Sequence, residues 1–227
     1  MVSSGRLEPC RLLQQNKISC SLWYEDAIAH YGVPTVLFDL YIVVPDIDIA
    51  AKLLRRFGWS SAPPRDRDMF HFLNSSTNLK YSRLAPPGLD QATAPRTILL
   101  CAHDWNLTAE QLRQSTMNGF YPFLAVLLDG LIGGLLNSTE DDLQCHLSVQ
   151  VSYVYAHVPQ VKYKTFVEKL SPQHRQFHLD CLAGMAIGTL PFLVHERQVR
   201  AELLAGTHQL KRCSASQTAE NSALFGM

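Results

Sequence analysis

Residues 22–46, LWYEDAIAHYGVPTVLFDLYIVVPD, decide the fold of this 227-residue chain. Apolar residues recur at helical spacing over 24–31, and a glycine and a proline follow, so this part predicts a helix that ends in a turn. Residues 35–44 are β-branched, aromatic and aliphatic, as in a strand buried on both faces. One acid, Asp39, lies inside that strand, and a buried carboxylate needs a partner or a role.

The patterns on either side of this stretch predict an α/β (α+β) fold. A helix is expected over 46–58, and strands at 69–73, 80–84 and 97–101 complete a small mixed sheet of four or five strands. Within this sheet we expect Leu37, Leu40, Ile42 and Val44 to be buried. From residue 108 the apolar period becomes helical, which predicts helices over 108–116, 122–136, 141–157, 161–169, 172–187 and 191–205.

This reading divides the chain into four parts. They are a flexible N-terminal segment (1–20), an α/β half (21–106), a helical half (107–206) and a disordered tail (207–227), with the seam between the halves at 102–108.

Residues 22–46 resemble the first motif of the nucleotidyltransferase-like fold, in which a helix and a small turn lead into a strand with an Asp-x-Asp pair. The chain is also similar to an uncharacterised group of fungal proteins, on the strength of residues 23–46, the AHDWN segment at 102–106 and the HRQFH segment at 174–178. The resemblance covers roughly residues 20–206. It implies a nucleotidyltransferase-like sheet and implies no activity for the group.

Several departures from the family pattern concern its metal site. The resemblance implies two carboxylates that hold Mg²⁺, since a hard divalent ion prefers several oxygen ligands, but this chain offers Asp39 and the neutral phenol of Tyr41. The family's glycine-bearing turn corresponds to Glu25 and Asp26, which would repel a triphosphate. The candidate strand at 79–84 supplies no third carboxylate. We therefore expect no ordinary nucleotidyl transfer, and Asp39 is the one candidate catalytic residue.

A second Asp-x-Asp pair, Asp46 and Asp48, follows Pro45 and precedes an apolar helical pattern. Carboxylates in the first turn of a helix accept its free N–H groups and complement its dipole. We interpret this pair as helix N-terminal residues.

Composition narrows the classes of partner. Twenty basic and twenty acidic residues balance, so the sequence does not favour binding to nucleic acid or an anionic membrane surface. The longest apolar run, 123–136, is shorter than a bilayer span and contains Asp129, which predicts a buried helix. The first 21 residues lack a secretory or mitochondrial pattern, and the six cysteines form no Cys-x-x-Cys pair. We expect a cytoplasmic protein with reduced thiols.

One set of residues has metal-ligand chemistry. His174, His178 and Cys181 have i, i+4 and i+7 spacing in a predicted helix and so share a face, which suits Zn²⁺. The same spacing also occurs when histidines form hydrogen bonds inside a helical core, and no fourth ligand is identifiable.

The acids and aromatic residues at loop ends suggest a ligand cleft between the two halves. Loops after strands often carry binding residues, although Asp104 or Asn106 could instead cap the next helix while Trp105 packs. Some of the acids are expected to pair with Lys80, Arg83 or Arg175. The cleft candidates are Glu25, Asp26, Asp39, Tyr41, Asp104, Trp105 and Asn106.

Two functions follow from the sequence. The first is a non-catalytic or divergent nucleotidyltransferase-like protein that binds a small molecule or a protein partner, without a cofactor. The alternative is an enzyme, either a divergent nucleotidyltransferase that uses Mg²⁺ or an accessory enzyme of fungal specialised metabolism.

Overall fold

The computed structural model describes residues 5–63, 79–88 and 94–215. The chain divides into two compact units, Met1–Gly130 and Leu131–Met227, here called the sheet unit and the helical unit. The sequence placed the seam earlier, at 102–108. The sheet unit extends further because the helix after that seam is tied to it: the Thr116 hydroxyl accepts a hydrogen bond from the Cys20 amide (2.8 Å) and lies 3.0 Å from the Cys20 carbonyl oxygen.

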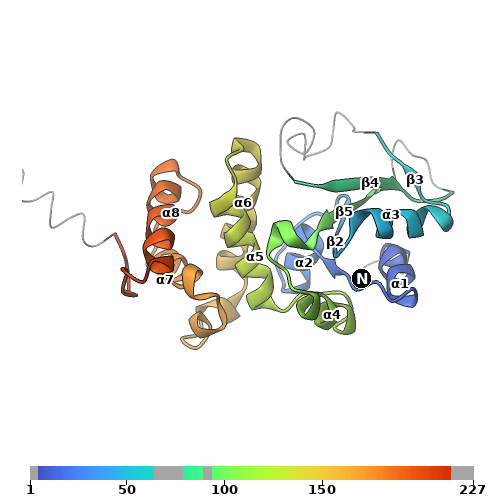
Figure 1. The fold of residues 1–227 in the computed structure, drawn as a ribbon. Helices are drawn as coiled ribbons and strands as arrows, with labels where there is room; N and C mark the ends of the chain where they lie inside the picture. The colour runs from blue at the N-terminus through green and yellow to red at the C-terminus, as the bar shows by residue number, and fades with distance from the viewer. Residues whose placement is uncertain (1–4, 64–78, 89–93, 216–227) are drawn as a thin grey trace, which may run out of the picture. The chain divides into compact units, whose positions relative to one another are not determined.

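The protein is α/β, as predicted, with a five-stranded mixed sheet in the sheet unit (Figure 1). The strand order is β1-β2-β5-β4-β3, in which β2 and β5 are parallel and the other neighbours are antiparallel. The strands are β1 (Ser21–Leu22), β2 (Leu40–Val44), β3 (Ser60–Ser61), β4 (Tyr81–Ala85) and β5 (Thr97–Cys101). The expected strand at 69–73 lies outside the described residues.

The helices of the sheet unit precede, separate and follow its strands along the chain. They are α1 (Glu8–Gln15), α2 (Tyr24–His30), α3 (Ile47–Arg56), the 3-10 helix η2 (Ala102–Trp105), α4 (Ala109–Met117) and the start of α5 (Leu124–Asn137). The helical unit contains the rest of α5, then α6 (Asp141–His157), the 3-10 helices η3 (Pro159–Lys162), η4 (Val167–Lys169) and η5 (Pro172–His174), and finally α7 (Arg175–Leu182) and α8 (Leu190–Leu204).

The central strand β2 is buried on both faces, because side chains alternate along a strand. Leu40, Ile42 and Val44 belong to a core that also contains residues of α1 and α3. Tyr41 and Val43 point to the opposite face and are equally buried. The predicted burial of this strand is therefore confirmed for every position within it.

The predicted strand was too long at its start. Residues 35–39 precede β2, and Leu37 is half-buried rather than buried. The strand β1, which pairs with β2, has only two residues, and they lie opposite Val43 and Ile42. The β1–β2 pairing therefore does not extend back to residues 35–39. Asp39 also uses its side chain to accept the Arg96 amide, at the point where the ladder with β5 begins.

The N-terminal segment, expected from the sequence to be flexible, contains a helix in its described part. Residues 8–15 form α1, whose Cys10, Leu12 and Leu13 are buried in the same core as β2. The helix is short but amphipathic, so its stability comes from packing rather than from propensity.

Residues 207–215 of the expected disordered tail are likewise ordered: the Lys211 amide donates to the Gln176 side chain and the Ser214 amide to Asp180. Residues 1–4 and 216–227 lie outside the description.

Candidate functional site

A pocket lies at the carboxyl ends of the parallel strands β2 and β5, where ligands bind in open α/β sheets. It has a volume of about 450 Å³, and we call it the edge pocket. Because β4 is antiparallel to β5, the start of β4 reaches the same edge. The lining residues are Pro45, Asp46, Ile47, Asp48, Leu79, Lys80, Tyr81 and Cys101.

The start of α3 supplies the acidic wall of the edge pocket. Asp46 is the N-cap residue of α3, and its carboxylate accepts the Ile49 amide at 2.9 Å. Asp48 lies in the first helical turn, and both acids are exposed. The interpretation of this pair as helix N-terminal residues is confirmed. The sequence missed that the same two carboxylates border a pocket.

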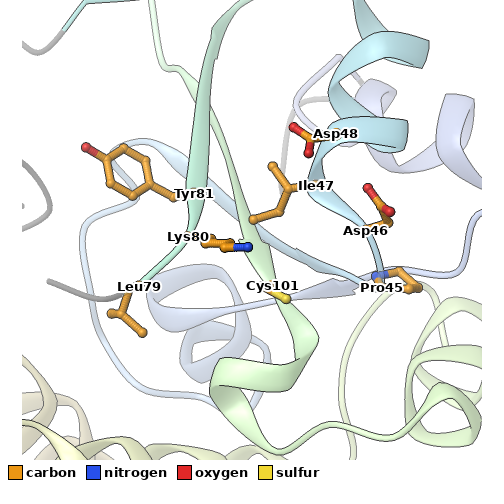
Figure 2. Close-up of a pocket in the computed structure, with 8 residues that line it drawn as sticks. All are labelled: Pro45, Asp46, Ile47, Asp48, Leu79, Lys80, Tyr81 and Cys101. Atoms are coloured by element: carbon orange, nitrogen blue, oxygen red, sulfur yellow. The ribbon is translucent and has the colours of Figure 1, made fainter.

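Lys80 supplies the basic group opposite those acids. Figure 2 shows its side chain projecting from the start of β4 toward α3, whereas the ring of Tyr81 points to the other side of the strand. Successive residues alternate in this way along a strand, and Tyr81 accordingly lies next to Arg83, whose guanidinium is 5.3 Å from the ring centroid. The pocket therefore combines one ammonium, two carboxylates and the apolar side chain of Ile47.

Asp39, the candidate catalytic acid, lies at the opposite end of β2 from the edge pocket. Strands rise about 3.3 Å per residue, so the strand places Asp39 and Pro45 roughly 20 Å apart. The Asp39 carboxylate accepts the Arg96 amide at 2.7 Å. In this position the acid organises the start of the β2–β5 ladder.

The two acids of the expected phosphate-binding turn are buried in α2. Arg6 donates to both carboxylate oxygens of Asp26, at 2.8 and 2.6 Å, and also to the carbonyl oxygens of Phe38 and Asp39. Lys80, Arg83 or Arg175 was expected in this role. Arg6 was missed because it belongs to the segment predicted to be flexible. Glu25 is also buried, next to this ion pair in the sequence.

The aromatic candidates form a packed cluster within the sheet unit. The Tyr24 ring meets the rings of Tyr41 and Trp105 edge-on, with centroids 5.1 and 5.3 Å away. Burial raises the pKa of the Tyr24 phenol, and the neighbouring Glu25 adds to this effect. Trp105 is buried and also contacts Trp23. These rings form part of the core, as the packing alternative for Trp105 proposed.

Neither Asp104 nor Asn106 caps α4, in contrast to the capping alternative. Thr108 is the N-cap residue and makes a reciprocal capping box with Gln111, a motif that satisfies two helix-end donors at once. Asp104 instead accepts the Lys80 amide at 3.3 Å, and Asn106 ends η2 with a left-handed φ of 53°. Asp104 thus positions the strand start that carries Lys80.

The proposed zinc residues His174, His178 and Cys181 do not converge in the structure. His178 Nδ1 lies 2.8 Å from the Tyr155 hydroxyl, and burial lowers the pKa of the imidazole to about 4. Across residues 5–63, 79–88 and 94–215, the three potential metal ligands that lie close together are Asp180, His195 and Glu196 instead. A one-helix spacing rule could not find this set, since it joins α7 to α8.

Comparison with known proteins does not assign the chain to a family. No protein-family model matches the chain, and a search of curated proteins gives no match. Within the described residues, no helix has both the length and the apolar character needed to cross a bilayer.

Proposed function

We propose that the sheet unit is a nucleotidyltransferase-like module without nucleotidyl transfer, and that it binds a small organic cation in the edge pocket. The observation that carries this proposal is the placement of Asp46 and Asp48 in a pocket at the carboxyl ends of β2 and β5. Two carboxylates against one ammonium favour a ligand with a positive group, and the wall of Pro45, Ile47 and Leu79 suits an apolar body.

Two features support the nucleotidyltransferase-like and non-catalytic parts of the proposal. Tyr24 has a φ of 51°, a left-handed backbone that favours glycine, at the turn where the resemblance expects one. The one candidate catalytic acid has a structural partner, since Asp39 accepts the Arg96 amide, and Asp26, at the turn where the family would bind phosphate, pairs with Arg6. A protein partner with an exposed lysine or arginine side chain would satisfy the same pocket chemistry.

A matched pair of ligands tests the charge preference of the edge pocket. Tyramine and 3-(4-hydroxyphenyl)propionate share a ring and a short chain but carry opposite charges. A ligand that binds only the folded protein raises the melting temperature, so tyramine at millimolar concentration should raise it and the propionate should not. Asp48→Asn should remove the shift. Asp142→Asn, an exposed acid in the first turn of α6, should retain it. An equal response to both compounds would refute the proposal.

The exposed Asp46 and Asp48 beside Lys80 favour one second candidate, a divergent nucleotidyltransferase that holds Mg²⁺ and nucleotide phosphate in the edge pocket. Under this alternative the carboxylates would hold the ion and Lys80 would contact the phosphates. Thermal shift with ATP separates the two functions. A stabilisation that requires Mg²⁺ and disappears in Lys80→Met would favour the enzyme over the cation-binding module.

A further inference from the structure

Two helices of the helical unit bring three ligand-type side chains together. Asp180 comes from α7, and His195 and Glu196 come from α8. One potential ligand atom from each lies within 4.8 Å of the others. Asp180 and Glu196 are buried, and His195 is half-buried, so this cluster lies below the surface with one side chain that reaches solvent.

Glu196 is the unexplained member of the cluster. The residue is 1% exposed, yet within the described part of the chain no N–H or hydroxyl group donates to either carboxyl oxygen, and its carboxyl group interacts instead with that of Asp180. The arginines that follow on α8 are committed elsewhere: Arg197 donates to the carbonyl oxygens of Leu136 and Ser138, and Arg200 donates to Asn137. Burying a carboxylate without a donor or a cation is costly. The cluster therefore contains a buried carboxyl group that needs either a proton or a cation as its complement.

The other two members are held in place by the segment that follows α8. The Ser214 amide donates to Asp180 at 2.6 Å, and the Ser214 hydroxyl hydrogen-bonds to a second oxygen of Asp180. The same hydroxyl lies 2.6 Å from His195 Nε2. Gln176 donates to Asp180 at 3.0 Å. Such outer hydrogen bonds orient metal ligands in proteins, and here they fix a carboxylate and an imidazole beside Glu196.

We propose that Asp180, His195 and Glu196 form a binding site for a divalent transition-metal ion. One imidazole nitrogen and two carboxylate groups match the donors that Zn²⁺ and Mn²⁺ accept. Donor atoms around a tetrahedral zinc ion lie about 3.3 Å apart, so the cluster needs a contraction of at most about 1.5 Å to bind one. This site is independent of the edge pocket, which lies in the other unit.

Zinc counting tests this proposal directly. The full chain is stripped with EDTA, dialysed against micromolar ZnSO₄ and analysed by atomic absorption, and we expect about one ion per chain. Glu196→Gln and His195→Asn each remove a ligand and should abolish binding under these conditions. Glu168→Gln and His103→Asn change exposed residues outside the cluster and should retain it.

The Ser214→Ala variant separates the effect of an outer hydrogen bond on zinc affinity from the effect of losing a ligand. It leaves all three ligands in place and removes one outer hydroxyl, so it should weaken zinc binding by about 10–100-fold, less than loss of a ligand. Far-UV circular dichroism checks that each variant is folded. His195→Asn changes a half-buried side chain, and this keeps the test decisive if Glu196→Gln does not fold.

Cobalt provides a second readout, since Co²⁺ bound at the site should give visible absorption bands that are lost in His195→Asn.

Two results would overturn the proposal. One is a wild-type chain that binds neither zinc nor cobalt, in which case Asp180 and Glu196 share a proton only. The other is binding that survives in both Glu196→Gln and His195→Asn, which would assign the ion to other histidines or cysteines.

Discussion

The sheet unit and the helical unit bury ionisable side chains in different ways. In the sheet unit, both carboxylate oxygens of the buried Asp26 accept hydrogen bonds from an arginine, and the Asp39 carboxylate accepts a hydrogen bond from a backbone amide. In the helical unit, burial lowers the pKa of His146 and His178 to about 4, and burial together with Asp180 raises the pKa of Glu196 to about 9. The two acids of the sheet unit are held by donors, whereas burial shifts these three groups of the helical unit toward their neutral forms.

This difference separates a structural use of buried acids from a chemical one. Arg6 satisfies Asp26 and also donates to the carbonyl oxygens before β2, so the ion pair attaches the N-terminal segment to the sheet. Among the described residues no N–H or hydroxyl group donates to Glu196, whose carboxyl group interacts with that of Asp180 instead. A carboxylate that is already paired with a guanidinium has little capacity left for a cation, whereas Asp180, which accepts only neutral donors in the described residues, and Glu196 retain it.

The largest expected effect comes from breaking the pairing in the sheet unit. Arg6→Ala leaves the Asp26 carboxylate buried without its arginine, and should lower the free energy of unfolding by about 3–5 kcal/mol in urea denaturation. Arg11→Ala is the control, since its pair with Glu8 is exposed and 3.8 Å long, and should cost less than about 1 kcal/mol. Equal losses in the two variants would contradict the role given to Arg6.

A smaller effect is expected from Ser214→Ala in the helical unit. The variant removes a hydroxyl that contacts Asp180 and His195 but keeps the Ser214 amide bond to Asp180. Loss of a buried hydrogen bond to a charged group costs about 1–3 kcal/mol, measured as the change in unfolding free energy. Thr207→Ala, which removes an exposed hydrogen bond to the Glu202 carbonyl, should be nearly neutral. A neutral Ser214→Ala would show that the segment after α8 is not held by this contact.

The pH dependence of the helical unit should reveal its neutral histidines. Burial holds the pKa of His146 at about 4, below its usual 6.5, so the unfolded chain takes up this proton first as the pH falls. The His146 contribution to stability is therefore complete above pH 6.5 and decreases toward pH 4, by up to about 1.4 kcal/mol per pH unit. Glu196 opposes this trend, so the wild type must be compared with a variant.

The variant is His146→Asn, in which this part of the pH dependence should be missing. Urea denaturation between pH 7.5 and 4.5 measures it, and the difference between the two proteins should be constant above about pH 7, where the imidazole is neutral in both states. A difference that stays constant down to pH 4.5 would mean that His146 titrates alike in the folded and unfolded chain.

The local sequence pattern correctly predicted the helices and strands whose buried positions follow the period of their own secondary structure. The strand at 97–101 and the helix at 141–157 have the predicted bounds, and both have regular buried positions. The expected helix over 161–169 is instead represented by the 3-10 helices η3 and η4. The expected helix over 172–187 ends at Leu182, because Gly184 adopts a left-handed φ of 92°.

The candidate sites depended on contacts that no local pattern contains. The sequence selected Asp39 for its place in a strand, but its role follows from Arg96, 57 residues away. It selected His174, His178 and Cys181 from the spacing of one helix, whereas Asp180 and His195 meet across two helices through Ser214. The sequence correctly predicted Asp46 and Asp48 as helix-start residues. It could not predict that the antiparallel pairing of β4 with β5 brings Lys80 to the same edge of the sheet.

The smallest expected effect is the sharpest test of the sheet unit. Asp39→Asn retains an oxygen that can accept the Arg96 amide, so the loss of stability should be about 1 kcal/mol or less. The wild-type protein should not transfer a labelled nucleotide from any nucleoside triphosphate to protein, RNA or small hydroxyl compounds in the presence of Mg²⁺, and the variant should behave in the same way.

The reason is geometric. Mg²⁺ requires several oxygen ligands, and Asp39 has the buried phenol Tyr41 two residues along β2 in place of a second carboxylate. Transfer that depends on Mg²⁺ and disappears in Asp39→Asn would make Asp39 a catalytic acid. The sheet unit would then use Asp39 for chemistry, and the comparison of structural acids in the sheet unit with a ligand site in the helical unit would no longer hold.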